Sequence, residues 1–188
     1  MKEVFKRGRI SQSNDEGRGL GLKRSGDVAA SYDAVIYVRE DNFELKLIYK
    51  NGKLHGLSED FYESGQLWSR QNYKNGKKDG LSELFFSKNN NNPLVLHGPT
   101  RTKGNYNNGK RDNLWEFFHE NGQPQSKGSW TDGLQHGPWE QFYKNDQLER
   151  RGNYKNGKEH GFFEHFRYNG QLTRKGNVKN NKKEGLWE

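Results

Sequence analysis

The sequence predicts an all-β protein, an elongated and largely single-layered antiparallel β-meander built from tandem hairpin repeats. Three observations lead to this fold class. A segment of about 24 residues recurs along the chain, each copy contains two turn signals, and no copy shows the 3.6-residue periodicity of a helix. Two turns per copy leave two strands per copy, so we expect about ten strands that follow one another in one sheet.

The repeat units start mostly at aromatic residues, and four of the five intervals between starts are 24 residues. The exception runs from Tyr73 to Tyr106 and is 33 residues long. Its surplus lies around a polar tract and Pro93, so we expect a loop inserted at a hairpin tip over about 88–96. The units start at Tyr49, Tyr73, Tyr106, Trp130, Tyr154 and Val178, and positions within a unit are numbered here from place 1.

Each unit has one turn signal at places 3 and 4 and another near places 16 and 17. The first is Asn-Gly in most units, for example Asn51 and Gly52, which favours a type I′ turn because both central residues need a positive φ. The second is Asn-Gly or Ser-Gly in most units, for example Asn121 and Gly122. If the second turn is a two-residue loop, two residues of a unit lie opposite each other across the hairpin when their place numbers add up to 33.

This register brings opposite charges together in every hairpin, since the glutamate at place 11 meets a basic residue at place 22. The predicted pairs are Glu59 with Arg70, Glu83 with Lys103, Glu116 with Lys127, Glu140 with Arg151, and Glu164 with Lys175. The same register sets the ring at place 10 opposite a glycine at place 23, which the ring can cover. These pairs are Trp115 with Gly128, Trp139 with Gly152, and Phe163 with Gly176.

Alternation along the strands divides the side chains between two faces. One face should carry places 10, 14, 19 and 1, which are Trp139, Tyr143, Leu148 and Tyr154 in the later units. The other should carry the charges and the phenylalanines of place 13. We expect the first face to be better buried.

The recurring NGK, the glycine four residues after its glycine, the E-x-F segment, NGQL and the closing Gly-Asn resemble the bacterial variant of the MORN repeat, found in the YwqK-type antitoxin family. The resemblance covers residues 49–188, with departures at Asn113 and Asn181, where glycine is usual. It implies an elongated single-layer sheet, no catalytic residues, and association with proteins or membranes. An antitoxin or immunity role is implied by the family name alone.

The chain before the repeats divides into two parts. Residues 1–24 include a segment rich in serine, glycine and charge and are expected to form a flexible arm. Residues 25–48 should form a β cap, with strands over 34–39 and 43–49 that cover the edge of the first repeat.

Composition narrows the function further. The net charge of +8 favours an acidic partner, such as an acidic protein face, nucleic acid or anionic lipid, although it also serves solubility. The chain has no stretch of about 18 apolar residues and no secretory signal pattern, so a cytoplasmic protein is expected, with peripheral attachment to a membrane as an alternative. The chain contains no cysteine, which excludes disulfides and thiolate metal sites.

No motif in the sequence indicates an enzyme, a cofactor, a metal or a small-molecule substrate. The strings from Gly104 and Gly152 mimic a phosphate-binding loop but lack the Ser or Thr that follows its lysine. His55, His136 and His160 share place 7, but acidic residues take that place in other units, which favours a polar turn residue over a metal ligand. The glutamate column has a basic residue opposite each member, which favours a structural ladder over paired catalytic carboxylates.

The expected function is therefore that of a non-catalytic, protein-binding repeat module, with antitoxin or immunity-type neutralisation of a partner as the specific hypothesis. Its alternative is binding of anionic membrane or nucleic acid through a basic rim. The first hypothesis uses the charged face, with Phe118, Phe142, Glu116 and Glu140 as contact residues. The second uses the turn lysines Lys53, Lys77, Lys110 and Lys158.

Overall fold

The computed structural model describes residues 34–40, 43–62, 64–87 and 97–188, and these residues form strands joined by turns, with no helix among them. This confirms the all-β prediction. The strands are β1 (Ala34–Glu40), β2 (Phe43–Lys50), β3 (Lys53–Leu54), β4 (Gly56–Phe61), β5 (Leu67–Lys74), β6 (Lys77–Phe85), β7 (Thr100–Asn107), β8 (Lys110–Phe118), β9 (Pro124–Thr131), β10 (Leu134–Phe142), β11 (Leu148–Lys155), β12 (Lys158–Phe166), β13 (Leu172–Lys179) and β14 (Lys182–Trp187).

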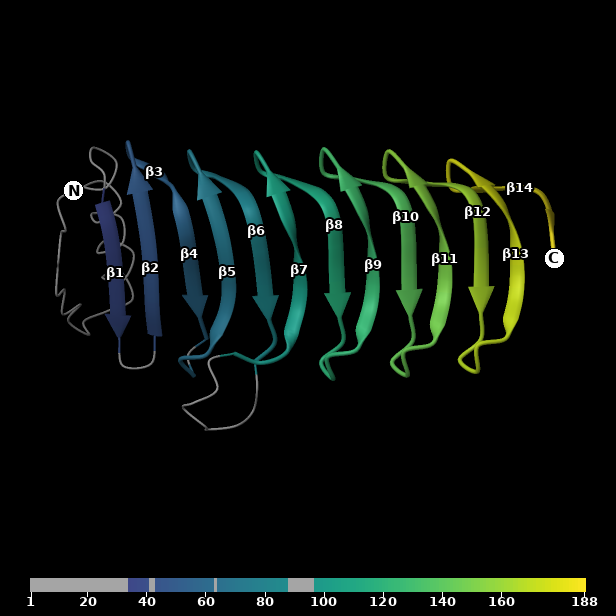
Figure 1. Ribbon diagram of the computed structural model, residues 1–188, viewed down its shortest axis with the longest axis horizontal. Coiled ribbons are helices and arrows are strands. Elements are labelled where there is room, and N and C mark those ends of the chain that lie inside the picture. The colour runs from purple at the N-terminus through teal and green to yellow at the C-terminus, as the bar shows by residue number, and fades with distance from the viewer. Residues whose placement is uncertain (1–33, 41–42, 63, 88–96) are drawn as a thin grey trace, which may run out of the picture.

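The strands form one antiparallel sheet in which their spatial order is their order in the chain. Only the two-residue strand β3 departs from this path, and it pairs with β2 beside the start of β4. Figure 1 shows the result, an open and elongated sheet that the chain crosses strand by strand from one end to the other. The predicted strands of the β cap are present as β1 and β2, whereas residues 1–24 and the insertion at 88–96 lie outside the described residues.

The first turn of each unit is the predicted type I′ turn. Asn156 and Gly157 have φ angles of 52° and 77°, and the other units repeat this pattern. The two asparagines that stand where glycine is usual also adopt a positive φ. Asn113, in β8, has a φ of 59°, and Asn181, in the last type I′ turn, has a φ of 67°. Asparagine tolerates this left-handed conformation better than most residues, so the fold is kept without glycine.

The second turn differs from the predicted two-residue loop. In the fourth unit the Tyr143 amide donates to the Gln147 carbonyl, and the Asp146 amide donates to the Tyr143 carbonyl, so the loop is longer. The register then shifts at a bulge, and Phe142 pairs with Leu148. Because residues paired across strands point to the same side, Leu148 lies on the face of Phe142, and its predicted placement with Trp139 was wrong.

Beyond this bulge the predicted register is confirmed. All five predicted charge partners are opposite each other in the sheet, from Glu59 with Arg70 to Glu164 with Lys175. The rings at place 10 do cover glycines, but each leans toward the preceding strand. A Cβ built on Gly128 would lie 2.1 Å from Trp139 Cε3, and one on Gly152 would lie 2.3 Å from Phe163 Cδ1.

The rings at place 10 form the thin core of the repeats, on what we name the ring face. Trp115 and Phe163 are each 1% exposed and Trp139 is 9% exposed, which confirms that this face buries its aromatic residues better. Their packing is edge-on and continuous, as in the contacts of Trp139 with Trp130 and Tyr154 at centroid distances of 6.3 and 5.8 Å. The opposite side, which carries the glutamates of place 11, is named the ladder face.

Candidate functional site

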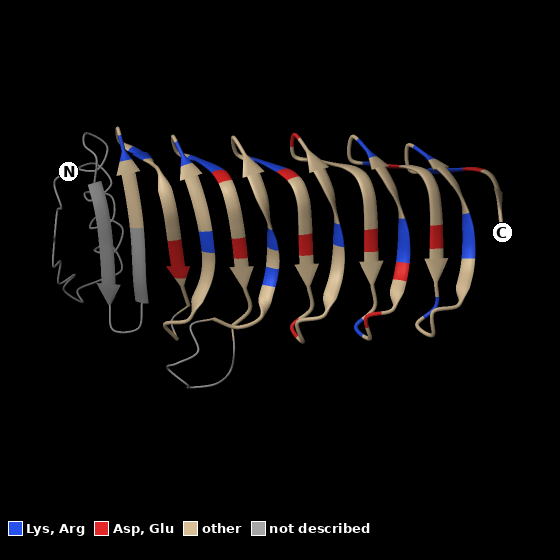
Figure 2. Cartoon of the chain, in the orientation of Figure 1, with Lys and Arg blue, Asp and Glu red and all other residues tan. Residues whose placement is uncertain are grey.

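A row of alternating charges crosses the ladder face from one end of the repeats to the other, as the red and blue bands of Figure 2 show. Each basic residue at place 22 lies between two glutamates, because it is in register with place 11 of its own unit and with place 11 of the next. Arg151, for example, is opposite Glu140 in β10 and opposite Glu164 in β12. Every internal member of the row therefore has a neighbour of opposite sign on both sides.

The ion pairs of the later units differ from the predicted ones. Lys127 contacts Glu140 at 3.0 Å and Lys175 contacts Glu188 at 2.9 Å, so both bind the glutamate of the following unit. In the early units the predicted partners do meet, as in the 2.8 Å contact between Arg70 and Glu59. The predicted register pairs each basic residue with the glutamate of its own unit, whereas both neighbouring strands offer a glutamate at the same level.

The ladder also perturbs its basic members. The hydrogen bond from Arg151 to Glu164 raises the pKa of the Arg151 guanidinium, and the bond from Lys175 to Glu188 raises the pKa of the Lys175 amine. Both shifts favour the charged form of these two basic residues. Most members of the row form an ion pair, and its glutamates from Glu59 to Glu164 are half-buried beside their basic partners, which fits a structural row better than a pair of catalytic carboxylates.

The predicted contact residues Phe118 and Phe142 lie on the ladder face beside Glu116 and Glu140, as expected, but both rings are half-buried. The ring of Phe142 is covered by Lys127, whose Nζ lies 5.6 Å from the ring centroid. Each phenylalanine at place 13 is thus packed between the charge row and the second turn.

A more accessible apolar row lies on the ladder face at place 9, and sequence reasoning missed it. Leu114 and Phe162 are 49% and 47% exposed, Leu186 is 94% exposed, and Pro138 is also exposed. The chain register sets these residues on the same face as Glu116 and Glu164, two positions before each glutamate. Phe162 and Leu186 also line a shallow hollow together with Lys175 and Glu188.

The turn lysines lie apart from this surface, along the edge that carries the Asn-Gly turns (Figure 2). Lys53, Lys77, Lys110 and Lys158 are all exposed, as predicted. Several turns also present a second lysine directly opposite the first. The opposed pairs are Lys50 with Lys53, Lys74 with Lys77, Lys155 with Lys158, and Lys179 with Lys182.

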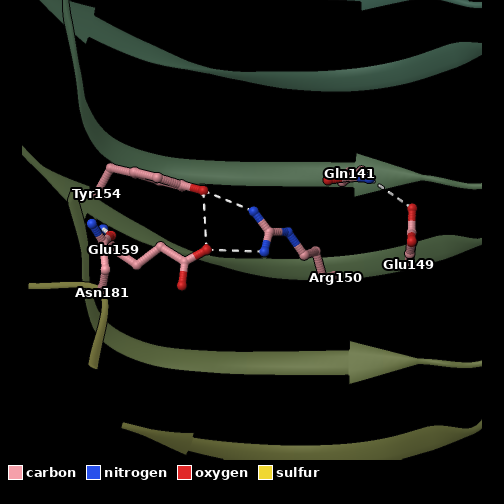
Figure 3. A network of polar contacts seen from close by, with 6 residues as sticks. All are labelled: Gln141, Glu149, Arg150, Tyr154, Glu159 and Asn181. Carbon is pink, nitrogen blue, oxygen red and sulfur yellow. Dashed lines mark hydrogen bonds and ion pairs between the residues drawn. The ribbon is translucent and has the colours of Figure 1, made fainter. Parts of the chain in front are cut away.

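The ring face holds cations among its aromatic side chains. The Arg111 guanidinium lies 4.4 Å from the centroid of Trp115 and 4.9 Å from that of Trp130. Further along the face, Arg150 donates to Glu159 at 2.9 Å and to the Tyr154 hydroxyl at 2.8 Å, as Figure 3 shows. Burial is the main cause that raises the pKa of the Tyr154 hydroxyl above its ordinary value.

Nothing in the described residues assembles a metal site, since no group of three or more His, Asp or Glu side chains there is placed to hold an ion. The string from Gly104 that mimics a phosphate loop lies in β7, its type I′ turn and β8, without the helix that such a loop requires. The described segments also contain no helix of the length and apolarity needed to cross a membrane.

Comparison with known families supports the reading of the repeats. The MORN repeat variant matches residues 54–75, 111–132 and 135–156 of this chain. The matched segments begin in β3, β8 and β10, and each ends at the first central residue of the next type I′ turn. The fold and the three matches show that the chain contains repeats of the MORN type, which suggest a binding repeat module.

No match was found among curated proteins. Among solved structures, a mutant of S. aureus TarM in complex with Fondaparinux, alpha-GlcNAc-glycerol and UDP is similar over 87% of this chain and 23% of that one, with 13% identity and a TM-score of 0.30. A second TarM structure is similar over 92% of this chain and 25% of that one, with 14% identity and a TM-score of 0.28. The chain thus spans about a quarter of the proteins that it matches.

Proposed function

We propose that this protein is a non-catalytic binding module that neutralises a protein partner by covering its surface, as an antitoxin or immunity protein does. The observation that carries the proposal is the exposed apolar row of Leu114, Pro138, Phe162 and Leu186 on the ladder face. These side chains recur at one level on alternate strands, with Ser129, Asn153 and Asn177 on the strands between them. Large apolar side chains that are exposed together on one face mark a surface that a partner covers.

The charges beside this row supply discrimination. A protein partner that buries the apolar row also meets the alternating ladder, and it must match the order of positive and negative groups along it. The half-buried Phe118 and Phe142 then support the contact rather than anchor it, because much of their surface is already packed in the free protein. The apolar row should therefore contribute more binding free energy than Phe118 and Phe142, and the test compares the two.

The test begins with isolation of the partner by chemical cross-linking to the full chain in native lysate, followed by its purification. Binding is measured by calorimetry with three variants: Leu114→Ser with Phe162→Ser, Phe118→Ala with Phe142→Ala, and the lysine variant with Gln at 53, 77, 110 and 158. We expect the first variant to lose about 2 kcal/mol of binding or more, as hot-spot residues do, and the lysine variant to lose less.

Two controls make the result decisive. The first variant should keep its stability to within about 0.5 kcal/mol, since it alters exposed side chains. Expression of the partner alone should inhibit growth, and only a chain with an intact apolar row should relieve the inhibition. Equal binding by the first variant and the wild type would refute the ladder face as the contact surface, and a harmless partner would refute neutralisation.

The opposed lysines favour one other candidate function, which is the binding of an anionic surface such as a membrane or nucleic acid through the turn edge. Like charges opposite each other destabilise a hairpin, and four turns carry such pairs. In the experiment above, this function predicts that the lysine variant loses the most binding and that its remaining affinity depends little on salt.

A further inference from the structure

Two neighbouring places on the ring face recur along the repeats, and on one pair of strands they hold a carboxylate. They are place 21 on one strand and place 6 on the next, and in β11 and β12 they are occupied by Arg150 and Glu159. The Glu159 carboxylate accepts a hydrogen bond from Arg150 Nη1 at 2.9 Å and one from the Tyr154 hydroxyl at 3.3 Å (Figure 3). Its backbone amide is held by Asn181 Oδ1 at 2.7 Å.

One unit further along, the same two places hold two cations. They are Arg174 on β13 and Lys183 on β14, so an ammonium stands where the preceding pair has its carboxylate. Both lie against one ring, since Lys183 Nζ is 4.6 Å and Arg174 Cζ is 5.9 Å from the centroid of Trp187. Both side chains are exposed, and within the described residues neither has an ion pair with a carboxylate.

A third nitrogen group completes the cluster. The His165 ring lies 5.9 Å from that of Trp187, and its pKa is lowered by burial first and then by the charge of Arg174. Arg150 and Lys183 act in the same direction, and Glu159 acts against them. The groups around His165 therefore carry an excess of positive charge that the described chain does not neutralise.

We propose that Arg174 and Lys183 bind a carboxylate supplied by another molecule, beside the indole of Trp187. The bound carboxylate would lie between the two cations, and the pair of Arg150 and Glu159 is the precedent in this chain for an arginine at place 21 that holds a carboxylate. An Asp or Glu side chain of a protein partner fits this description, with Trp187 as an apolar wall for its methylene groups. The site lies on the face opposite to the apolar row, so its test does not depend on the proposed function.

The repeats supply matched variants for the test. Lys183→Glu would rebuild the internal pair of Arg150 and Glu159, so it should fill the site from within. Arg174→Ser with Lys183→Gln would install the residues that stand at these places on β9 and β10, namely Ser126 and Gln135. Because the fold already accommodates these residues elsewhere, both variants should fold, which their unfolding curves can verify.

The experiment follows the Trp187 indole and the His165 ring by NMR in the full chain while acetate replaces chloride at constant ionic strength. In the wild type we expect saturable shifts of both signals and an upward shift of the His165 pKa, because a bound anion favours the imidazolium. In both variants the saturable shifts should be lost. In Lys183→Glu the pKa of His165 should already be raised without acetate.

Three results would overturn the proposal. They are the absence of saturable shifts in the wild type, an unchanged response in the two variants, and a response to inorganic phosphate without one to acetate. A response to acetate that an acidic peptide of four glutamates reproduces at lower concentration would support a protein side chain as the natural source, since several carboxylates near one site raise their effective concentration.

Discussion

At the scale of single residues, the ring at place 10 packs directly over a glycine of the preceding strand. A side chain on Gly104, Gly128 or Gly152 would overlap the ring of the next strand, since the added Cβ would lie 2.1–2.3 Å from ring atoms. Ring and glycine therefore form one packing unit, and the sequence shows both partners. It does not show toward which neighbour each ring leans, because a glycine stands opposite the ring on both sides.

This packing predicts very different costs for two single substitutions. Trp139→Ala should destabilise the protein by about 3–5 kcal/mol, because a buried large ring is lost. Lys158→Ala, at an exposed place beside a turn, should change stability by at most about 0.5 kcal/mol. Chemical denaturation of both variants measures the difference, and equal midpoints would contradict the assignment of the ring face as the core.

At the scale of the hairpin, local turn chemistry decides which parts of the register the sequence can predict. The type I′ turns follow directly from Asn-Gly, and the charge partners follow from counting outward from the turns. The bulge beside the second turn could not be counted in advance, because it depends on a left-handed residue inside that loop, such as Asp146 or Gly170. The longer loop shifts the register beside it by one residue, and Leu148 therefore lies on the ladder face.

The ion pairs of the ladder predict an asymmetric coupling around Lys127. A double-mutant cycle with Lys127→Gln and Glu140→Gln should give a coupling of about 0.2–1 kcal/mol, which falls as salt is added. The matched cycle of Lys127 with Glu116 should give less, because these two residues are in register but form no ion pair among the described residues. A larger coupling to Glu116 than to Glu140 would show that the predicted partner is the true one.

At the scale of the whole molecule, the fold has little interior, because each strand packs mainly against the strands beside it. This is why the sequence could predict a repeat surface but not its most accessible part. Leucine, proline and phenylalanine at place 9 look like core residues, and Leu114, Pro138 and Phe162 are exposed because the described residues form no second layer over them. The lysine edge, by contrast, was predictable, since a turn lysine is exposed in any arrangement of the sheet.

The elongated shape can be measured directly by small-angle X-ray scattering. Twelve steps between neighbouring strands at about 4.8 Å span roughly 58 Å, so the maximum dimension should reach at least about that length. A measured maximum dimension clearly below this length would contradict the open sheet and indicate that the strands fold back on themselves.

The alternating charge row has a consequence for how proteins of this design change their length during evolution. Loss or gain of one strand would bring two glutamates, or two basic residues, to the same level on adjacent strands. Loss or gain of two strands keeps the order of signs and returns the chain to the same edge of the sheet. Such arrays should therefore grow and shrink in whole hairpins, and a gene fusion that cuts a hairpin in half should be selected against even where the backbone could pair.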